Sequence, residues 1–164
     1  AGAGFAGYVW LQPSGWKAEK SQKVSAPPAK VYGVVSDLRG WADWWKSAGI
    51  GGSLSKFAVS PKEGVGANLT IEIPGAPVRV ELIELKAPDA AIFEVDPSPS
   101  DGQHRFRLKL AVNPDGDGSV VTATMDRQLS FTEKLLDVMT GAITKTANSR
   151  LPKLLEDLKT AAEK

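Results

Sequence analysis

The amino-acid sequence predicts one α+β domain in which a long amphipathic C-terminal helix closes an antiparallel sheet over an apolar interior. Three observations predict this fold: short alternating segments fill the middle of the chain, two short helical segments follow the first strand, and apolar residues recur every three or four positions after Ser130. The 164 residues fit a single domain. We assign it to residues 14–164, because no linker divides them.

The predicted strands are short segments of alternating apolar and polar residues that end at glycine- or proline-containing turns. They cover 16–24, 54–59, 69–73, 78–83, 91–95, 104–112 and 120–129. The clearest is His104–Val112, where Phe106, Leu108 and Leu110 alternate with basic residues. The connections are too short for βαβ crossovers, so the pattern indicates antiparallel hairpins.

Helices are predicted on both sides of these strands. Pro27 and Pro28 open the first helix, whose apolar stripe follows the helical repeat at Val31, Val34, Val35 and Leu38. Gly40 ends it, and Trp41–Trp45 form a second short helix. Ser130 and Glu133 match a capping box that starts the C-terminal helix. Its apolar stripe consists of Leu135, Met139, Ile143, Ala147, Leu151, Leu154, Leu158 and Ala162. Pro152 should cause a kink or a restart.

The first 13 residues form an apolar leader, since positions 1–12 carry no charged residue. One interpretation is a leader that packs loosely against the domain. The other is the remnant of a membrane anchor, with Tyr8 and Trp10 as interfacial aromatic residues. The uncharged run is shorter than the roughly 20 residues that a membrane span needs.

Composition argues against several classes of function. The net charge of +1 argues against a nucleic-acid partner, and the absence of cysteine excludes disulfides and thiolate chemistry. A single histidine, His104, excludes a multi-histidine metal site. We therefore predict no metal and no cofactor. His104 has no serine or cysteine nucleophile beside it in a known catalytic motif, so we interpret it as a residue at a strand end.

Three further motifs have ordinary structural interpretations. The segment Asp115–Ser119 resembles the start of a calcium loop, but Val120 stands where an EF-hand needs glycine, so a hairpin turn is the better interpretation. Gly64 and Gly66 precede a strand rather than a helix, which argues for a turn and against a phosphate loop. Arg105, Arg107 and Lys109 lie on a solvated strand face, where Glu81, Glu84 and Glu94 could pair with them.

Trp41, Trp44 and Trp45 fall within five residues and permit two interpretations. They can plug the edge of the core, or they can line or gate an apolar pocket. Three such side chains cannot all face the core from one short helix. At least one of them should therefore lie near a pocket mouth or at the surface.

The order of these elements resembles the START/Bet v 1-like (SRPBCC) superfamily. The similarity rests on Ser25–Tyr32, Asp37–Leu38, Trp41–Trp44 and the closing segment 151–163, and it is greatest to the bacterial polyketide cyclase/dehydrase and lipid-transport branch. The resemblance implies a helix-grip fold, in which a curved antiparallel sheet wraps around the C-terminal helix and leaves a cavity. It also implies binding of lipids, sterols, hormones or polyketides, and a membrane segment before the first strand in some members.

We therefore predict binding or transport of a hydrophobic small molecule or lipid. The predicted lining residues are Trp41, Trp44, Trp45, Leu69, Ile71, Phe93, Phe106, Leu108, Leu110, Met139 and Ile143. No catalytic motif of the family's enzymes can be matched. A cyclase-like or aromatase-like enzyme stays open as an alternative, with His104, Asp126 or Glu72 as acid or base. An interaction module with a filled core is the third hypothesis.

Overall fold

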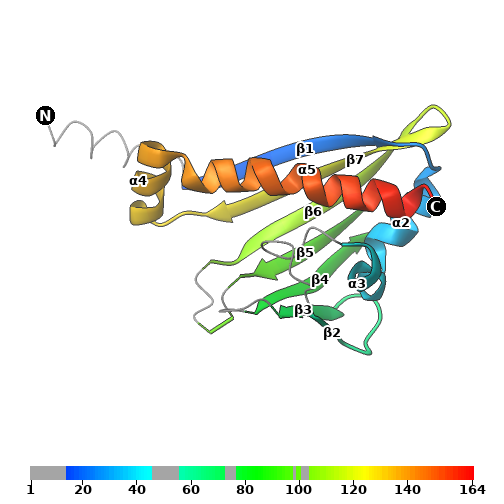
Figure 1. Cartoon of the computed structure of the whole chain (residues 1–164), viewed down its shortest axis with the longest axis horizontal. Coiled ribbons are helices and arrows are strands. Elements are labelled where there is room, and N and C mark those ends of the chain that lie inside the picture. Colours follow the sequence, from blue (N-terminus) through cyan, green and yellow to red (C-terminus); the bar gives the residue numbers. More distant parts are fainter. Residues whose placement is uncertain (1–13, 46–55, 73–76, 98, 101–103) are drawn as a thin grey trace, which may run out of the picture.

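A computed structural model describes residues 14–45, 56–72, 77–97, 99–100 and 104–164, and Figure 1 shows their arrangement. Within these residues one antiparallel sheet has the order β1-β7-β6-β5-β4-β3-β2. Its strands are β1 (Gly15–Val24), β2 (Lys56–Val59), β3 (Asn68–Glu72), β4 (Val78–Lys86), β5 (Ala90–Asp96), β6 (Phe106–Asp115) and β7 (Gly118–Gln128). The predicted α+β fold and the hairpin order from β2 to β7 are confirmed. For the strand predicted at 54–59, residues 54 and 55 lie outside the described part of the chain.

The helices gather on one face of the sheet. After β1 come α2 (Pro28–Ser36), the 3₁₀ turn η1 (Leu38–Gly40) and α3 (Trp41–Trp44), while α4 (Phe131–Thr140) and α5 (Ala142–Ala162) follow β7. The longest helix, α5, lies along β1 and β7 and contacts α2 at its C-terminal end (Figure 1). At the opposite end of the sheet lies α4. This arrangement is helix-grip-like, as the family resemblance implies.

The core lies between this helical layer and the inner face of the sheet, which we define by the buried residues that alternate along its strands. Strand register aligns Leu82, Phe93, Leu108, Met125 and Ala18 in one row across five strands. From the helices, Ala147, Leu151, Leu154, Leu155 and Leu158 of α5 and Val31 and Val35 of α2 pack against it. Val31 and Val35 of α2 and Leu108, Leu110 and Val112 of β6 belong to the predicted stripes and are buried. Val34 and Phe106 are only partly buried, and Leu38 is buried in η1, because α2 ends at Ser36 rather than at Gly40.

The C-terminal helix differs from its prediction, because it is divided at Gly141 rather than at Pro152. Gly141 adopts a left-handed conformation (φ 63°) and separates α4 from α5. In contrast, α5 continues through Pro152 without a restart. Both Pro152 and Asn148 are exposed, so water can satisfy the carbonyl that loses its helical partner. The capping box of Ser130 and Glu133 is present as predicted.

A Gly141→Ala substitution should lower the free energy of unfolding by about 1–2 kcal/mol, because a side chain is disfavoured in the left-handed conformation. Urea unfolding followed by circular dichroism measures this change. Gly33→Ala is the matched control, since Gly33 lies in α2 with open space around a built Cβ atom. That control should be neutral or stabilising. A Gly141→Ala protein as stable as the wild type would show that the division at Gly141 is dispensable.

The turn motifs also take their ordinary structural roles. The two-residue turn Gly116-Asp117 joins β6 to β7, where Asp115 pairs with Gly118 in register and forms an ion pair with Lys23. Gly64 and Gly66 have positive φ angles in the connection before β3. Among the residues that the structure describes, no group of three acidic or histidine side chains could hold a metal ion.

Positions 1–13 lie outside the described residues, so both interpretations of the apolar leader stay predictions. In the part of the chain that is described, no helix is both long and apolar enough to cross a membrane.

Candidate functional site

The tryptophan cluster covers the centre of the inner face. Trp41 is fully buried, and its ring centroid lies 4.5 Å from that of Phe93 on β5. Trp44 and Trp45 pack on Trp41 with centroid separations of 5.2 and 5.5 Å. The indole N–H of Trp41 donates to the carbonyl of Val35, 3.2 Å away, which ties the cluster to α2. Trp41 and Trp44 thus belong to the core, while Trp45 is only partly buried.

Burial of the inner face changes along the central strands. Leu110, Val112, Val121 and Ala123 are fully buried toward the end near α2. Toward the other end of β1, β6 and β7, three apolar inner-face residues are only partly buried. They are Trp16, Phe106 and Met125. Because these three lie at the same end of neighbouring strands in the sheet register, where β7 contacts α4 through Arg127 and Glu133, we call this region the α4 end of the inner face.

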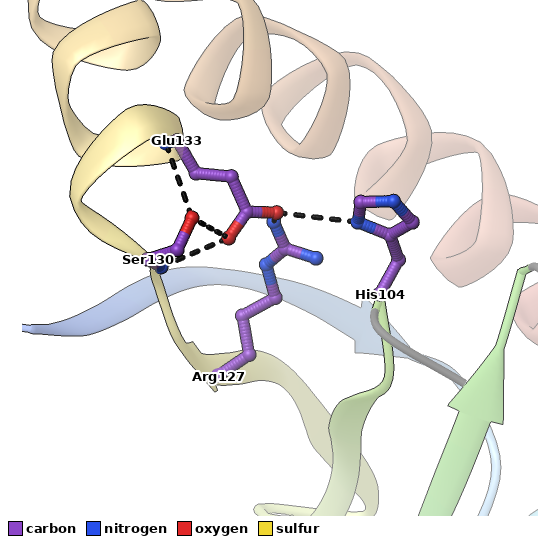
Figure 2. A network of polar contacts seen from close by, with 4 residues as sticks. All are labelled: His104, Arg127, Ser130 and Glu133. Atoms are coloured by element: carbon purple, nitrogen blue, oxygen red, sulfur yellow. Dashed lines mark hydrogen bonds and ion pairs between the residues drawn. The ribbon is translucent and has the colours of Figure 1, made fainter. Parts of the chain in front are cut away.

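Arg127 places a positive charge at this α4 end. It follows Met125 by two residues on β7 and stands opposite Trp16 on β1, so alternation directs its side chain to the inner face. Only 11% of that side chain is exposed, and its guanidinium bonds to the carboxylate of Glu133. Figure 2 shows this pair together with Ser130 and His104. A charge at this depth needs such a partner, because desolvation disfavours the charged form.

Glu133 is the centre of the polar network in Figure 2. Its Oε2 accepts from the backbone N–H of Ser130 at 2.9 Å and from the Ser130 hydroxyl at 3.0 Å. Its Oε1 lies 3.2 Å from His104 Nδ1. Burial raises the pKa of Glu133, but the Ser130 hydrogen bonds and the Arg127 charge outweigh it and hold the pKa below its usual range. The carboxylate is therefore ionised at neutral pH.

A second polar group connects the same end of the sheet to α5. The hydroxyl of Thr144 donates to Asp137 Oδ2 at 2.7 Å and accepts from Trp16 Nε1 at 3.1 Å. The backbone N–H of Thr144 also donates to Asp137, at 3.0 Å. These bonds fix the first turn of α5 against β1. They leave Trp16 with its ring on the inner face and its N–H satisfied.

Two buried side-chain donors, one on α3 and one on β7, have no hydrogen-bond partner within the described part of the chain. They are the indole nitrogen of Trp44 and the Nε atom of Arg127. An unpaired buried donor costs about 1–3 kcal/mol, so each one needs an explanation. Both nitrogens can donate to an acceptor atom of a bound molecule, and neither can accept a hydrogen bond.

The structure brings together most of the predicted lining residues. Trp41, Trp44, Leu69, Ile71, Phe93, Leu108 and Leu110 are buried in the core, and Trp45 and Phe106 are partly buried against it. The two predicted helix residues lie elsewhere. Met139 is 68% exposed on α4, and Ile143 is partly buried outside the core cluster. The break at Gly141 accounts for this difference, because it separates the apolar stripe of α4 from that of α5.

Sequence reasoning missed Arg127, Met125, Trp16 and Leu82. The signal for the first two was present, since alternation along the last strand directs Val121, Ala123, Met125 and Arg127 to one face.

Among the predicted acid–base candidates, Asp126 lies opposite Arg107 on the outer face, and Glu72 is exposed there as well. His104 is exposed but contacts Glu133. Of the acidic residues predicted to pair with Arg105, Arg107 and Lys109, Glu94 binds Arg105, which also binds Asp96. The other two pair elsewhere, Glu81 with Arg79 and Glu84 with Lys86.

Comparison with known proteins agrees with this geometry. A family model described as polyketide cyclase / dehydrase and lipid transport matches residues 15–163. The chain belongs to this family. The predicted resemblance to the SRPBCC superfamily is thereby confirmed. No curated protein sequence matches the chain significantly.

Several solved structures share the fold of this chain at low sequence identity. Truncated norcoclaurine synthase from Thalictrum flavum has a TM-score of 0.67 at 16% identity, over 92% of this chain and 96% of that one. The same enzyme in complex with dopamine and hydroxybenzaldehyde has a TM-score of 0.66 at 15% identity, over 90% and 86% of the two chains. The protein TTHA0849 from Thermus thermophilus has a TM-score of 0.65 at 19% identity, over 90% and 97%.

Proposed function

We propose that this family member binds a hydrophobic small molecule or lipid at the inner face, and that the molecule carries one hydrogen-bond acceptor. The observation that carries the proposal is the buried, unpartnered Nε of Arg127 beside the partly buried apolar residues Phe106 and Met125. Apolar burial would supply most of the affinity, at about 25 cal/mol per Å² before ordering costs. The donor would select a carbonyl, carboxylate or hydroxyl at one end of the molecule.

The family description and the architecture support this function. The family name includes lipid transport, and one structure with the same fold holds two small aromatic molecules. Ligand sites of this kind are mainly apolar, with a few polar groups that fix orientation. The α4 end of the inner face has that composition, because Trp16 stands opposite Arg127 in the strand register and Phe106 and Met125 occupy neighbouring inner-face positions.

Binding is tested by titrating the delipidated full chain with 1-anilinonaphthalene-8-sulfonate and then displacing this dye with oleate. We expect saturable binding and competitive displacement. A Met125→Trp substitution should weaken both by about tenfold or more, because it fills space at the α4 end. Val65→Trp is the matched control, since Val65 is 50% exposed and outside the core. If neither compound binds saturably, or if Met125→Trp binds as tightly as the control, the proposal fails.

A cyclase-like enzyme is the second candidate, and the contact between His104 and Glu133 favours it. A histidine oriented by a carboxylate is a common general base, and this one lies beside the α4 end. His104→Ala distinguishes the two functions, because the substitution should leave dye binding intact but abolish turnover of a poly-β-ketone substrate. If the folded protein takes up no apolar compound at all, the third hypothesis, an interaction module with a filled core, becomes the preferred one.

A further inference from the structure

The short helix α4 turns its apolar side away from the domain and its polar side toward it. Phe131, Leu135, Val138 and Met139 recur at helical spacing and share one side of α4. Leu136 lies at the edge of this side, and Leu135 at its centre is only partly buried. In an ordinary surface helix this side would face the core. Here, however, none of the residues of α4 is buried. Phe131, Leu136, Val138 and Met139 are exposed by 44%, 49%, 44% and 68%.

The polar side of α4 is the side held against the domain. Glu133 reaches inward to Arg127 and His104, and Asp137 binds the hydroxyl and backbone N–H of Thr144. These contacts fix the rotation of α4 about its own axis. The outward direction of the apolar side is therefore imposed by a specific polar network and is a built feature of the fold.

The exposed side of α4 also has a distinctive charge pattern. Both acidic residues of the helix are engaged toward the domain, whereas Lys134 in its first turn and Lys145 in the first turn of α5 place amines at its two ends. The amine of Lys134 is 3.4 Å from the Ser14 hydroxyl, and that of Lys145 is 2.9 Å from the Thr140 carbonyl. An outward apolar face with cations at its ends is the composition of helices that lie in an anionic membrane interface.

The position of α4 is also suited to contact with a membrane surface. It lies at the extremity of the molecule farthest from α2 (Figure 1). Ser14, where the uncharged leader joins the domain, is next to the start of α4, because its carbonyl accepts from the Leu129 N–H at 2.8 Å. The uncharged residues 1–12 thus join the domain beside α4.

We propose that the outer face of α4, formed by Phe131, Leu136, Val138 and Met139, docks into the interface of a bilayer that contains anionic lipids. The helix would lie in the membrane plane, with its apolar residues at the boundary between headgroups and acyl chains. Because the opposite side of α4 contacts Arg127 through Glu133, docking would place the membrane next to the helix that borders the proposed ligand site, and this part of the inference rests on the proposed function.

The test uses the full chain with vesicles of phosphatidylcholine and phosphatidylglycerol in a co-sedimentation assay. We expect binding that weakens with salt and falls in pure phosphatidylcholine vesicles. Met139→Glu should lower the partition coefficient by about tenfold or more, because a charge replaces an inserted apolar group. Val65→Glu is the matched control, since Val65 is an exposed apolar residue outside α4. It should bind vesicles like the wild type.

A second measurement identifies what covers α4. The chain has no cysteine, so Met139→Cys and Val65→Cys each give one labelling site for an environment-sensitive fluorophore. We expect a blue shift at position 139 only when vesicles are added, and none at position 65. A blue emission at 139 without vesicles would overturn the proposal. If that blue shift does not depend on protein concentration, the leader covers α4. If it grows with protein concentration, a second copy of the chain covers α4. Vesicle binding that Met139→Glu leaves unchanged would also overturn it.

Discussion

Replacing Phe93 by alanine is expected to lower the free energy of unfolding by about 3–5 kcal/mol, the typical cost of removing a fully buried aromatic side chain. Phe93 lies at the centre of the inner face, between Leu82 and Leu108 in the strand register, and packs on Trp41 at 4.5 Å. The truncation would remove contacts with sheet and helices at once. Urea unfolding followed by tryptophan fluorescence measures the change.

Phe131→Ala is the matched control for this prediction, because it is the same chemical change at a side chain that is 44% exposed on α4. It should cost less than about 1 kcal/mol. Comparing the two variants separates the effect of burial on the free energy of unfolding from the effect of losing an aromatic ring. Equal losses at the two positions would show that the inner face around Phe93 is not the core on which the domain depends.

The sequence predicted those parts of the fold that depend on local periodicity. Alternation from Phe106 to Val112 identified the inner face of β6, since a strand's side chains must point to opposite sides. The stripe of Val31, Val35 and Leu38 placed α2 and η1 on the core for the equivalent helical reason. These patterns are decided within a few residues, so no tertiary information was needed to interpret them.

The orientation of α4 could not be predicted in this way. The periodicity around Leu135 and Met139 is helical, and the capping box at Ser130 correctly starts the helix. Yet periodicity does not state which side of a helix faces the domain. That choice depends on Arg127 and Thr144, which give Glu133 and Asp137 partly buried polar partners. Because the left-handed Gly141 separates the two helices, the side of α5 that faces the domain does not determine which side of α4 does so.

The candidate site likewise has one part that the sequence predicts and one part that it does not. Its apolar part follows from alternation, and seven of the predicted residues are buried at or against the inner face. Its polar part depends on a charged residue at an inward position of β7. A charge there breaks the alternating pattern of the sequence, although departures of this kind are expected at functional sites. Arg127 is such a departure, and its unpartnered Nε is the atom on which the proposed ligand selectivity depends.

Glu133→Ala is expected to lower the free energy of unfolding by about 2–4 kcal/mol at neutral pH. The substitution removes the acceptor of the Ser130 bonds and leaves the guanidinium of Arg127, only 11% exposed, without its carboxylate. Glu63→Ala is the matched control, since Glu63 pairs with Arg39 at 2.7 Å on the exposed surface. It should leave the unfolding midpoint nearly unchanged, because exposed ion pairs contribute little.

The pH dependence of this loss has a definite sign. Because the folded protein holds the pKa of Glu133 below its usual range, the carboxylate stabilises the fold fully above the ordinary glutamate pKa of about 4.3. That contribution disappears as the pH falls through the lowered pKa of the folded state. The difference in unfolding free energy between wild type and Glu133→Ala should therefore be constant near neutrality and shrink in acid. A difference that stays constant from pH 7 to pH 3 would mean that the ionised carboxylate, and hence its pairing with Arg127, does not stabilise the α4 end of the inner face.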